Sequence, residues 1–466
     1  MVVGVDSSTQ STKVEVRDAD SGALVASGRA PHPAAVPPKS EQDPAAWWHA
    51  FETAFAAAGS PDAAAISVAG QQHALVACDA EGTPVRPAKL WNDTETAPDA
   101  AWLIKQLGGP EPWADACGTV PVAALTIAKL SWLHRSEPEV FARMARVLLP
   151  HDWLTWKLTG AFVTDRGDAS GTGYWSPSAG EWRFDVLAIV DKEKDWKSVL
   201  PAVLGPAETA GDWRSAVVGP GTGDNMGAAL GLGLRPGDVA ISLGTSGTVF
   251  TVAERPTADA SGAVCGFADA TGRFQPLVCT LNATKVTDTV GRLLGLDRPQ
   301  MEALAVGAPA GAGGVVLLPY FDGERTPNRP KATGVLTGIR TDARQEQLVR
   351  AAYEGVACSL LDGLDALAAA GVETGGRLFL AGGGSRSRAY QRVIADLAQR
   401  PVLVPDEPEA VAAGACAQAA ALLTGATPTD VAAGWNLANG SIVEPDHSVD
   451  PTAVREAYAA LRDQTG

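Results

Sequence analysis

The feature that most constrains this chain is a strand–turn–strand motif that occurs twice, once at the start of each half. Residues 2–17 contain an apolar run, a polar turn and an alternating segment typical of a returning strand. Residues 239–252 repeat this order. Recurrence at half-chain distance predicts a duplicated domain rather than a short-period solenoid.

The length of 466 residues exceeds one ordinary core and suits two or three domains. Glycine and proline cluster at residues 233–237, so we predict domains at 1–233 and 234–466, the second ending in a helix. Strands alternate with helices, which predicts an α/β fold. The predicted helices include 45–58, 125–136, 138–144, 226–232, 345–370 and 388–400.

Charge and composition exclude several classes of partner. The formal net charge of −16 repels nucleic acid and anionic membranes at long range, so we expect neither as a partner. The six cysteines show no C-x-x-C pair and no zinc-ligand spacing, which predicts reduced thiols. Asp6 interrupts the segment where a signal peptide would be most apolar, and no run of about 18 apolar residues follows. We therefore expect a cytoplasmic protein.

The polar turns of the two hairpins are candidate phosphate sites. A tight turn with small polar residues leaves several backbone N–H groups free to bind phosphate oxygens. In the first turn, Asp6 could hold hydrated Mg²⁺ and Lys13 could neutralise a phosphate. For either hairpin alone, an ordinary turn is the favoured interpretation. Two of them, one in each half, favour a phosphate clamp.

A glycine run, 382–384, lies between a predicted strand and a predicted helix, where it permits close approach to a ligand. It doesn't match the P-loop pattern, and no G-x-G-x-x-G follows the first strand. Asp224, ahead of a predicted helix, could be a general base or a helix N-cap. Spacing alone favours the helix N-cap.

Two further segments carry polar groups suited to a sugar. His73 ends a predicted strand, where side chains of α/β folds often face a ligand. A surface histidine or a satisfied core histidine is the alternative, and it is favoured when His73 is taken alone. Trp91 could stack on a sugar, with Asn92 and Asp93 as hydrogen-bonding groups. A buried tryptophan followed by an Asx turn fits the same three residues.

Taken together, these residues resemble the FGGY family of carbohydrate kinases along nearly the whole chain. The motifs are residues 4–6 with Thr9 and Lys13, 40–44 before Trp47 and Trp48, 70–73, 90–93, 148–150 with Asp152, 168–172, 223–225, 242–247, 318–320, 323–327, 334–339, 347–348, 351–354 and 382–387. This order and number of matches is far more specific than any single motif.

The resemblance implies two actin-like, ribonuclease-H-like domains, with ATP and a sugar between them. It implies Asp224 as catalytic base, and Asp6 with Asp224 as ligands of Mg²⁺. The implied sugar ligands are Gln72, His73, Trp91, Asp224 and Asn225. The implied nucleotide ligands are Thr9, Gln10, Lys13, Gly244, Thr245, Gly383, Gly384 and Ser387.

The sequence departs from the family pattern at three places. Ser8 stands where the first turn usually has glycine, and a turn with β-region backbone would accept its Cβ. Gln72 stands where the most similar members often have methionine. Leu125 and Ser136 are off-pattern in the N-terminal signature.

The expected reaction is phosphoryl transfer from MgATP to the terminal hydroxyl of D-xylulose. Within the family, L-ribulose, glycerol or gluconate could be the acceptor instead. A non-catalytic, actin-like sugar sensor is the alternative from another class, although Asp224 is present. The expected partners are the sugar and ATP, and a homodimer stays open.

Overall fold

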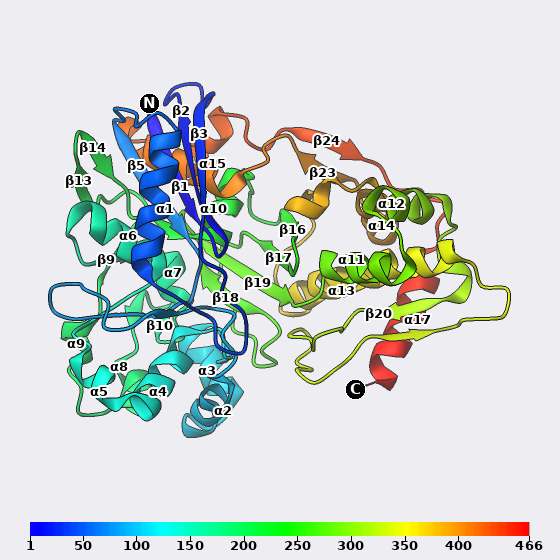
Figure 1. The fold of residues 1–466 in the computed structure, drawn as a ribbon, viewed down its shortest axis with the longest axis horizontal. Coiled ribbons are helices and arrows are strands. Elements are labelled where there is room, and N and C mark those ends of the chain that lie inside the picture. The colour runs from blue at the N-terminus through cyan, green and yellow to red at the C-terminus, as the bar shows by residue number, and fades with distance from the viewer. Residues whose placement is uncertain (466) are drawn as a thin grey trace. The chain divides into compact units, whose positions relative to one another are not determined.

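The computed structural model describes residues 1–465, which form two compact units. Unit 1 contains Met1–Leu234, Glu254–Gln275 and Glu409–Ala438, and unit 2 contains the remainder of the chain (Figure 1). The predicted division between residues 233 and 234 falls beside the end of the first segment. The prediction of a single boundary assigned Glu254–Gln275 and Glu409–Ala438 to the second domain, but both segments belong to unit 1.

The central sheet of unit 1 has the strand order β13-β14-β5-β1-β2-β3, and β15 also pairs with β5. The first predicted hairpin is the antiparallel pair β1 and β2, whose register places Asp6 opposite Lys13. β5 runs parallel to β1. The bounds are β1 Val2–Ser7, β2 Ser11–Arg17, β3 Leu24–Pro31, β5 Ala65–Gly70, β13 Gly211–Trp213, β14 Ala216–Val218 and β15 Thr222–Gly223.

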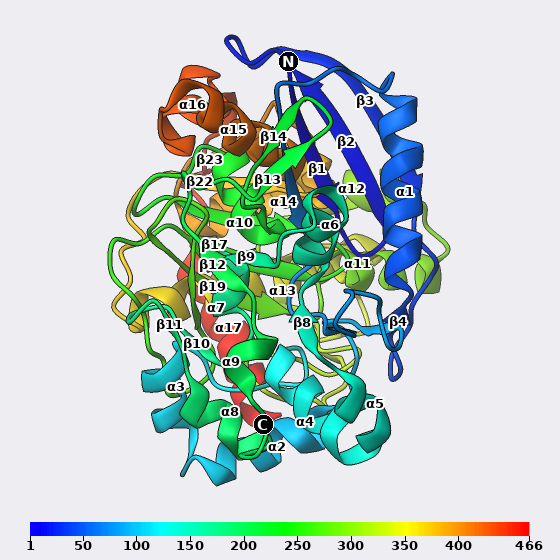
Figure 2. The same ribbon diagram turned by 90° about the vertical axis from the view of Figure 1, so that its left-hand side faces the viewer.

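Helices cover both faces of this sheet (Figure 2). On one side lies α1 (Pro44–Ala57), which Asp43 caps by accepting a hydrogen bond from the Ala45 N–H. Pro44 at the first helical position suits this start, and Trp47 and Phe51 are buried. On the other side α15 (Ala410–Thr424) packs against β1 and β5, together with α10 (Asp224–Gly231).

Close packing of α15 on β1 depends on Gly4. A Cβ at Gly4 would lie 2.2 Å from the carbonyl oxygen of Ala412 and 2.7 Å from Cys416 Sγ. The apolar contacts of this face include Val2, Ala65, Leu230 and Ala417, all buried. The remaining elements of unit 1 are β4 Glu41–Gln42, β6 Val76–Cys78, β7 Ala88–Lys89, α2 Ala97–Gln106, α3 Pro110–Cys117, α4 Thr126–Ser136, α5 Pro138–Arg143, β8 Arg146–Leu148, α6 Pro150–Thr159, β9 Val163–Asp165, α7 Arg166–Ser170, β10 Trp175–Ser176, β11 Glu181–Trp182, α8 Phe184–Val190, α9 Trp196–Val199, β12 Ala202–Leu204, β18 Cys265–Ala268 and α16 Pro428–Gly434.

Unit 2 contains the second predicted hairpin, β16 and β17, in the strand order β19-β17-β16-β22-β23-β24. Leu243 pairs with Gly247, so the turn between them is Gly244–Ser246. β22 runs parallel to β16, and α13 packs against β17. The bounds are β16 Val239–Leu243, β17 Gly247–Thr251, β19 Phe274–Thr280, α11 Thr284–Leu294, α12 Arg298–Gly307, β20 Val316–Leu318, β21 Val335–Thr337, α13 Gln345–Ala369, β22 Leu378–Ala381, α14 Arg388–Ala398, β23 Val402–Pro405, β24 Gly440–Val443 and α17 Pro451–Gln464.

The predicted helices are confirmed with small changes at their ends. The helix expected over 226–232 begins at Asp224. Its N-cap is Gly223, so Asp224 occupies the first helical position and is not the cap. The N-cap interpretation of Asp224 is therefore wrong, and its carboxylate is left for another role.

Candidate active site

The turn between β1 and β2 gathers an ion cluster around Asp6, which is buried at 1% exposure. Lys13 Nζ lies 3.2 Å from Asp6 Oδ2 and 2.6 Å from Glu409 Oε2, and the Ser8 hydroxyl donates a hydrogen bond to Asp6. Burial raises the pKa of Asp6, and Glu409 adds to this, while Lys13 and Ser8 oppose it. Glu409 directly precedes α15 and lies 396 positions after Lys13. Because of this separation, the sequence did not predict Glu409 as part of this site.

Ser8 fits this turn without special backbone. Ser8 does not occur among the non-glycine residues with positive φ in the described part of the chain. The turn therefore accepts a Cβ at this position, and the serine adds a hydrogen bond that glycine could not supply.

Asp224 opens α10 in unit 1, beside Asn225. Asn225 Nδ2 donates to Asp224 Oδ1 at 3.0 Å and to Gln72 Oε1 at 2.9 Å. Removal of the carboxyl from water, together with repulsion from Asp6 and Asp168, raises the pKa of Asp224 to about 8. The structure thus brings together Gln72, Asp224 and Asn225, three of the residues predicted to contact the sugar.

Asp6 and Asp224 form a donor set suited to a divalent cation. Both are carboxylates, and each has a raised pKa in this environment. Their mutual repulsion is one cause of the shift at Asp224, and a dication would relieve it. Hard oxygen ligands with one or two carboxylates match the preference of Mg²⁺. The residues therefore fit the metal that the family resemblance implies.

His73 has a strained backbone and a closely packed ring. Its φ of +67° lies in the left-handed region, which is uncommon for residues other than glycine. Thr126 Oγ1 donates to its carbonyl oxygen at 3.1 Å. Its ring lies 5.4 Å from that of Phe267, and a Cβ at Gly171 would come within 2.5 Å of its Nδ1. The site therefore holds the imidazole in one defined position.

In the segment 91–93, Trp91 and Asp93 make different kinds of contact. Trp91 Nε1 donates to Thr9 Oγ1 at 2.8 Å, which joins a predicted sugar ligand to a predicted phosphate ligand. Asp93 is buried and accepts hydrogen bonds from the N–H groups of Ser40 and Glu95. The Asx-turn interpretation is thus correct for Asp93, whose carboxylate is already occupied.

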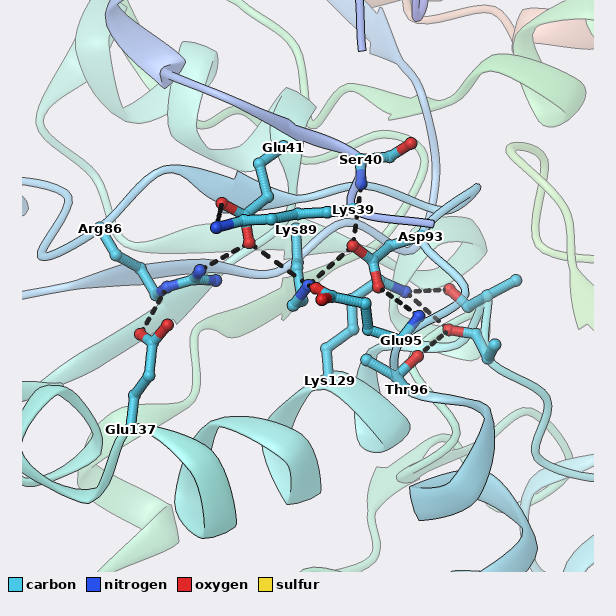
Figure 3. Close-up of polar contacts among 12 residues, drawn as sticks. Lys39, Ser40, Glu41, Arg86, Lys89, Asp93, Glu95, Thr96, Lys129 and Glu137 are labelled. Atoms are coloured by element: carbon cyan, nitrogen blue, oxygen red, sulfur yellow. Dashed lines mark hydrogen bonds and ion pairs between the residues drawn. The ribbon is translucent and has the colours of Figure 1, made fainter. Parts of the chain in front are cut away.

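A lysine-centred ion network supports this segment (Figure 3). Lys89 Nζ lies 2.7 Å from Asp93, 2.6 Å from Glu95 and 3.3 Å from Glu41. Although burial alone would lower it, these carboxylates raise the pKa of Lys89. The three acids are close enough to hold a metal ion, but the ammonium group already supplies the positive charge. The network is therefore structural.

A buried histidine behind β15 was missed by the sequence analysis. His151 Nδ1 lies 2.8 Å from Asp168, and its Nε2 lies 3.1 Å from Asp152 and 3.6 Å from Asp165. Despite burial, these carboxylates raise the pKa of His151 to about 10, so it is a cation at neutral pH. Thr222, two residues before Asp224, donates to Asp165 Oδ2 at 3.0 Å. The cluster thereby supports β15, the strand that directly precedes Asp224.

In unit 2, the turn at Gly244 and the glycine run both lie at the ends of parallel strands β16 and β22. Thr284 donates through its N–H and Oγ1 to the Gly244 carbonyl, and the Ala283 N–H donates to that of Thr245. Gly384 is required by packing, since a Cβ would lie 2.6 Å from Leu243 Cδ2. By contrast, a Cβ at Gly383 would meet no atom within 4 Å.

The two remaining predicted nucleotide ligands lie before a helix and in a turn. Ser387 directly precedes α14, and Gln10 is exposed in the first turn, where its carbonyl accepts from the His32 N–H. The assignments of these residues to the nucleotide stay predictions.

Among residues 1–465, no single helix is long and apolar enough to cross a membrane; the bent pair α15 and α16 meets the length and composition test jointly.

Comparison with known proteins identifies the family. Residues 1–227 match the N-terminal domain, and residues 239–423 the C-terminal domain, of the FGGY family of carbohydrate kinases. A xylulose kinase of Streptomyces coelicolor is 48% identical over 95% of this chain and 92% of its own. A xylulose kinase of Haemophilus influenzae is 34% identical over 90% of each chain.

A solved structure agrees with this assignment. The crystal structure of xylulose kinase from Bifidobacterium adolescentis has a TM-score of 0.88 and 39% identity, covering 99% of both chains. A gluconate kinase from Lactobacillus acidophilus, 22% identical with a TM-score of 0.91, shares the fold. The predicted family and two-domain α/β fold are confirmed, and this chain belongs to the FGGY carbohydrate kinases, a family of phosphotransferase enzymes.

Proposed function

We propose that this enzyme transfers the γ-phosphoryl group of MgATP to the 5-hydroxyl of D-xylulose, giving D-xylulose 5-phosphate and ADP. The observation that carries the phosphoryl transfer is Asp224: it opens α10 without capping it, and Asn225 holds its carboxylate near Asp6. The choice of D-xylulose is supported by the relatives of 34–48% identity that are named xylulose kinases.

In this reaction Asp224 accepts the proton of the sugar hydroxyl. The hydroxyl oxygen forms a bond to the γ-phosphorus while the bond to the bridging β–γ oxygen breaks, and ADP leaves with that electron pair. Asp6 and Asp224 would hold Mg²⁺, which when bound neutralises charge on the phosphates. A bound dication would favour the ionised form of Asp224, which is the form that accepts a proton.

The sugar ligands we propose are Gln72, His73, Trp91 and Asn225, with Asp224 at the reacting hydroxyl. His73 can donate and accept hydrogen bonds, which suits a polyhydroxyl ligand. For the nucleotide we propose Thr9, Gln10 and Lys13 of unit 1 and Gly244, Thr245, Gly383, Gly384 and Ser387 of unit 2. Lys13 would exchange its contact with Asp6 or Glu409 for a phosphate oxygen.

The test is ADP release measured with D-xylulose, L-ribulose, glycerol and gluconate as acceptors. We expect the highest kcat/KM with D-xylulose and product phosphorylated at carbon 5. A higher kcat/KM with another acceptor would overturn the substrate assignment. An enzyme that binds ATP and sugar without any ADP release would instead favour the sensor alternative.

A further inference from the structure

We infer that Gln275 is a positioning residue for the acceptor sugar, which fixes Asn225 and thereby contributes to the choice of sugar. This inference rests on the proposed function, since it concerns the same site. Gln275 lies on β19, within the segment Glu254–Gln275 that belongs to unit 1.

The first observation is a buried amide bound to the backbone of a proposed sugar ligand. Gln275 is 0% exposed, and its Nε2 donates to the main-chain carbonyl oxygen of Asn225 at 2.8 Å. Loss of this buried bond would remove the side-chain contact that holds this carbonyl and let the start of α10 shift.

The second observation is that the side-chain amide of Asn225 has both protons occupied. Its Nδ2 donates to Gln72 Oε1 and to Asp224 Oδ1. These two bonds define which way the amide faces, and they leave Oδ1 as the atom that can accept a hydrogen bond from a sugar hydroxyl. With Gln275 holding the backbone, that acceptor has one fixed position.

The third observation is that the segment Glu254–Gln275 also supports His73. Phe267 on β18 lies against the His73 ring, at 5.4 Å between centroids. The segment therefore supports two proposed sugar ligands. The ion cluster of Asp6, Lys13 and Glu409 is held by other parts of unit 1.

A fixed acceptor discriminates between sugars by the direction of one hydroxyl. A ketose whose hydroxyl points elsewhere leaves Asn225 Oδ1 unpaired, and such unpaired polar groups give a site its selectivity. Loosening Asn225 should therefore weaken both the affinity for the preferred ketose and the preference over an isomer.

The experiment compares Gln275→Met, which keeps the side-chain length without a donor, and Gln275→Glu, which keeps an acceptor but loses the donor. We expect the KM for D-xylulose to rise about tenfold in both, equivalent to one lost hydrogen bond. The ratio of kcat/KM for D-xylulose over L-ribulose should fall about fivefold. The KM for ATP should stay within about twofold of wild type.

A matched control is Gln418→Met. Gln418 is another buried glutamine of unit 1, and its Nε2 donates to the main-chain carbonyl of Gly221 at 3.0 Å. This variant should lower Tm as much as Gln275→Met and leave the ratio between the two ketoses unchanged. A ratio that falls equally in the control would show a merely structural effect and overturn the inference.

The outcomes separate this inference from the proposed function. An active wild-type enzyme whose Gln275→Met variant keeps the wild-type ketose ratio, or raises the KM for ATP equally, overturns the role of Gln275 alone. If wild type phosphorylates no ketose, the proposed function fails. Calorimetry of ketose binding without nucleotide then still tests the role of Gln275. There we expect a weaker Kd for Gln275→Met and an unchanged Kd for Gln418→Met.

Discussion

The indole Nε1 of Trp91 donates a hydrogen bond to Thr9 Oγ1 at 2.8 Å. This bond connects the segment after β7 to the turn between β1 and β2. One residue is a proposed sugar ligand and the other a proposed phosphate ligand, so the two sides of the reaction share a direct contact within unit 1.

A double-mutant cycle should detect this contact. We expect Thr9→Val and Trp91→Phe each to raise the KM for ATP about fivefold, and the double variant to raise it no further than either single variant. The expected coupling is about 1 kcal/mol, since either substitution removes the same hydrogen bond. Steady-state kinetics of the four proteins measures it. If the increases in KM of the two single variants multiply in the double variant, the coupling is contradicted. The control, Trp182→Phe, removes an indole donor bound to the Pro201 carbonyl at 3.2 Å.

Asp224→Asn should abolish most activity without unfolding the protein. The amide keeps an acceptor and nearly the same size, and Gly223 remains the cap of α10. We expect kcat to fall by about 10²–10⁴, with little change in the KM for ATP. Retention of more than about a tenth of wild-type kcat in a folded variant would falsify the general-base role. Asp185→Asn, in the exposed first turn of α8, is the matched control.

Gly171→Ala should act on the sugar through His73. The new methyl group would lie 2.5 Å from two atoms of the imidazole, so the ring must move. We expect the KM for D-xylulose to rise about tenfold or more and the KM for ATP to stay within about twofold. Gly307→Ala, where a Cβ meets no atom within 4 Å, should behave as wild type. Equal effects on both substrates would remove His73 from the sugar side.

His151→Gln should destabilise the protein in a pH-dependent way. Because the pKa of His151 is raised from 6.5 to about 10, its stabilising charge is fully present below pH 6.5 and is lost as pH rises toward 10. Removing this buried cation at pH 8 should lower the free energy of unfolding by about 3–5 kcal/mol.

The deficit of this variant should be largest near pH 6.5 and shrink as pH rises toward 10, because wild type loses the same charge there. Thermal unfolding of wild type and variant between pH 6.5 and pH 10 measures the difference. A deficit that stays constant or grows toward pH 10 would contradict the charged cluster. His49→Gln, on the exposed side of α1, is the control.

The sequence predicted what depends on local pattern. The two hairpins and the helices α1 and α13 follow from apolar periodicity, turn residues and caps, all of which act over a few residues. The motifs that resemble the family also predicted Gln72, Asp224 and Asn225, which the structure brings into contact. The start of α10 was misjudged because glycine and aspartate are both common caps.

What the sequence did not reveal depends on distant segments. Glu409 meets Lys13 across 396 positions of sequence, and Gln275 meets Asn225 across 50. His151 becomes a cation because α6 and α7 bring three carboxylates around it, which no local spacing indicates. Such contacts follow from tertiary packing, which a single sequence does not encode as a readable pattern.

The packing of α15 on β1 has a consequence for synthesis on the ribosome. Residues 1–234 emerge first, yet the helix that covers Val2 and Ala65 is translated more than a hundred residues later, at 410–424. Until then, α10 is the helix of residues 1–234 that lies on this face, and the apolar surface that α15 later covers is available to chaperones. Unit 1 of this kinase is thus begun first and completed among the last parts of the polypeptide to appear.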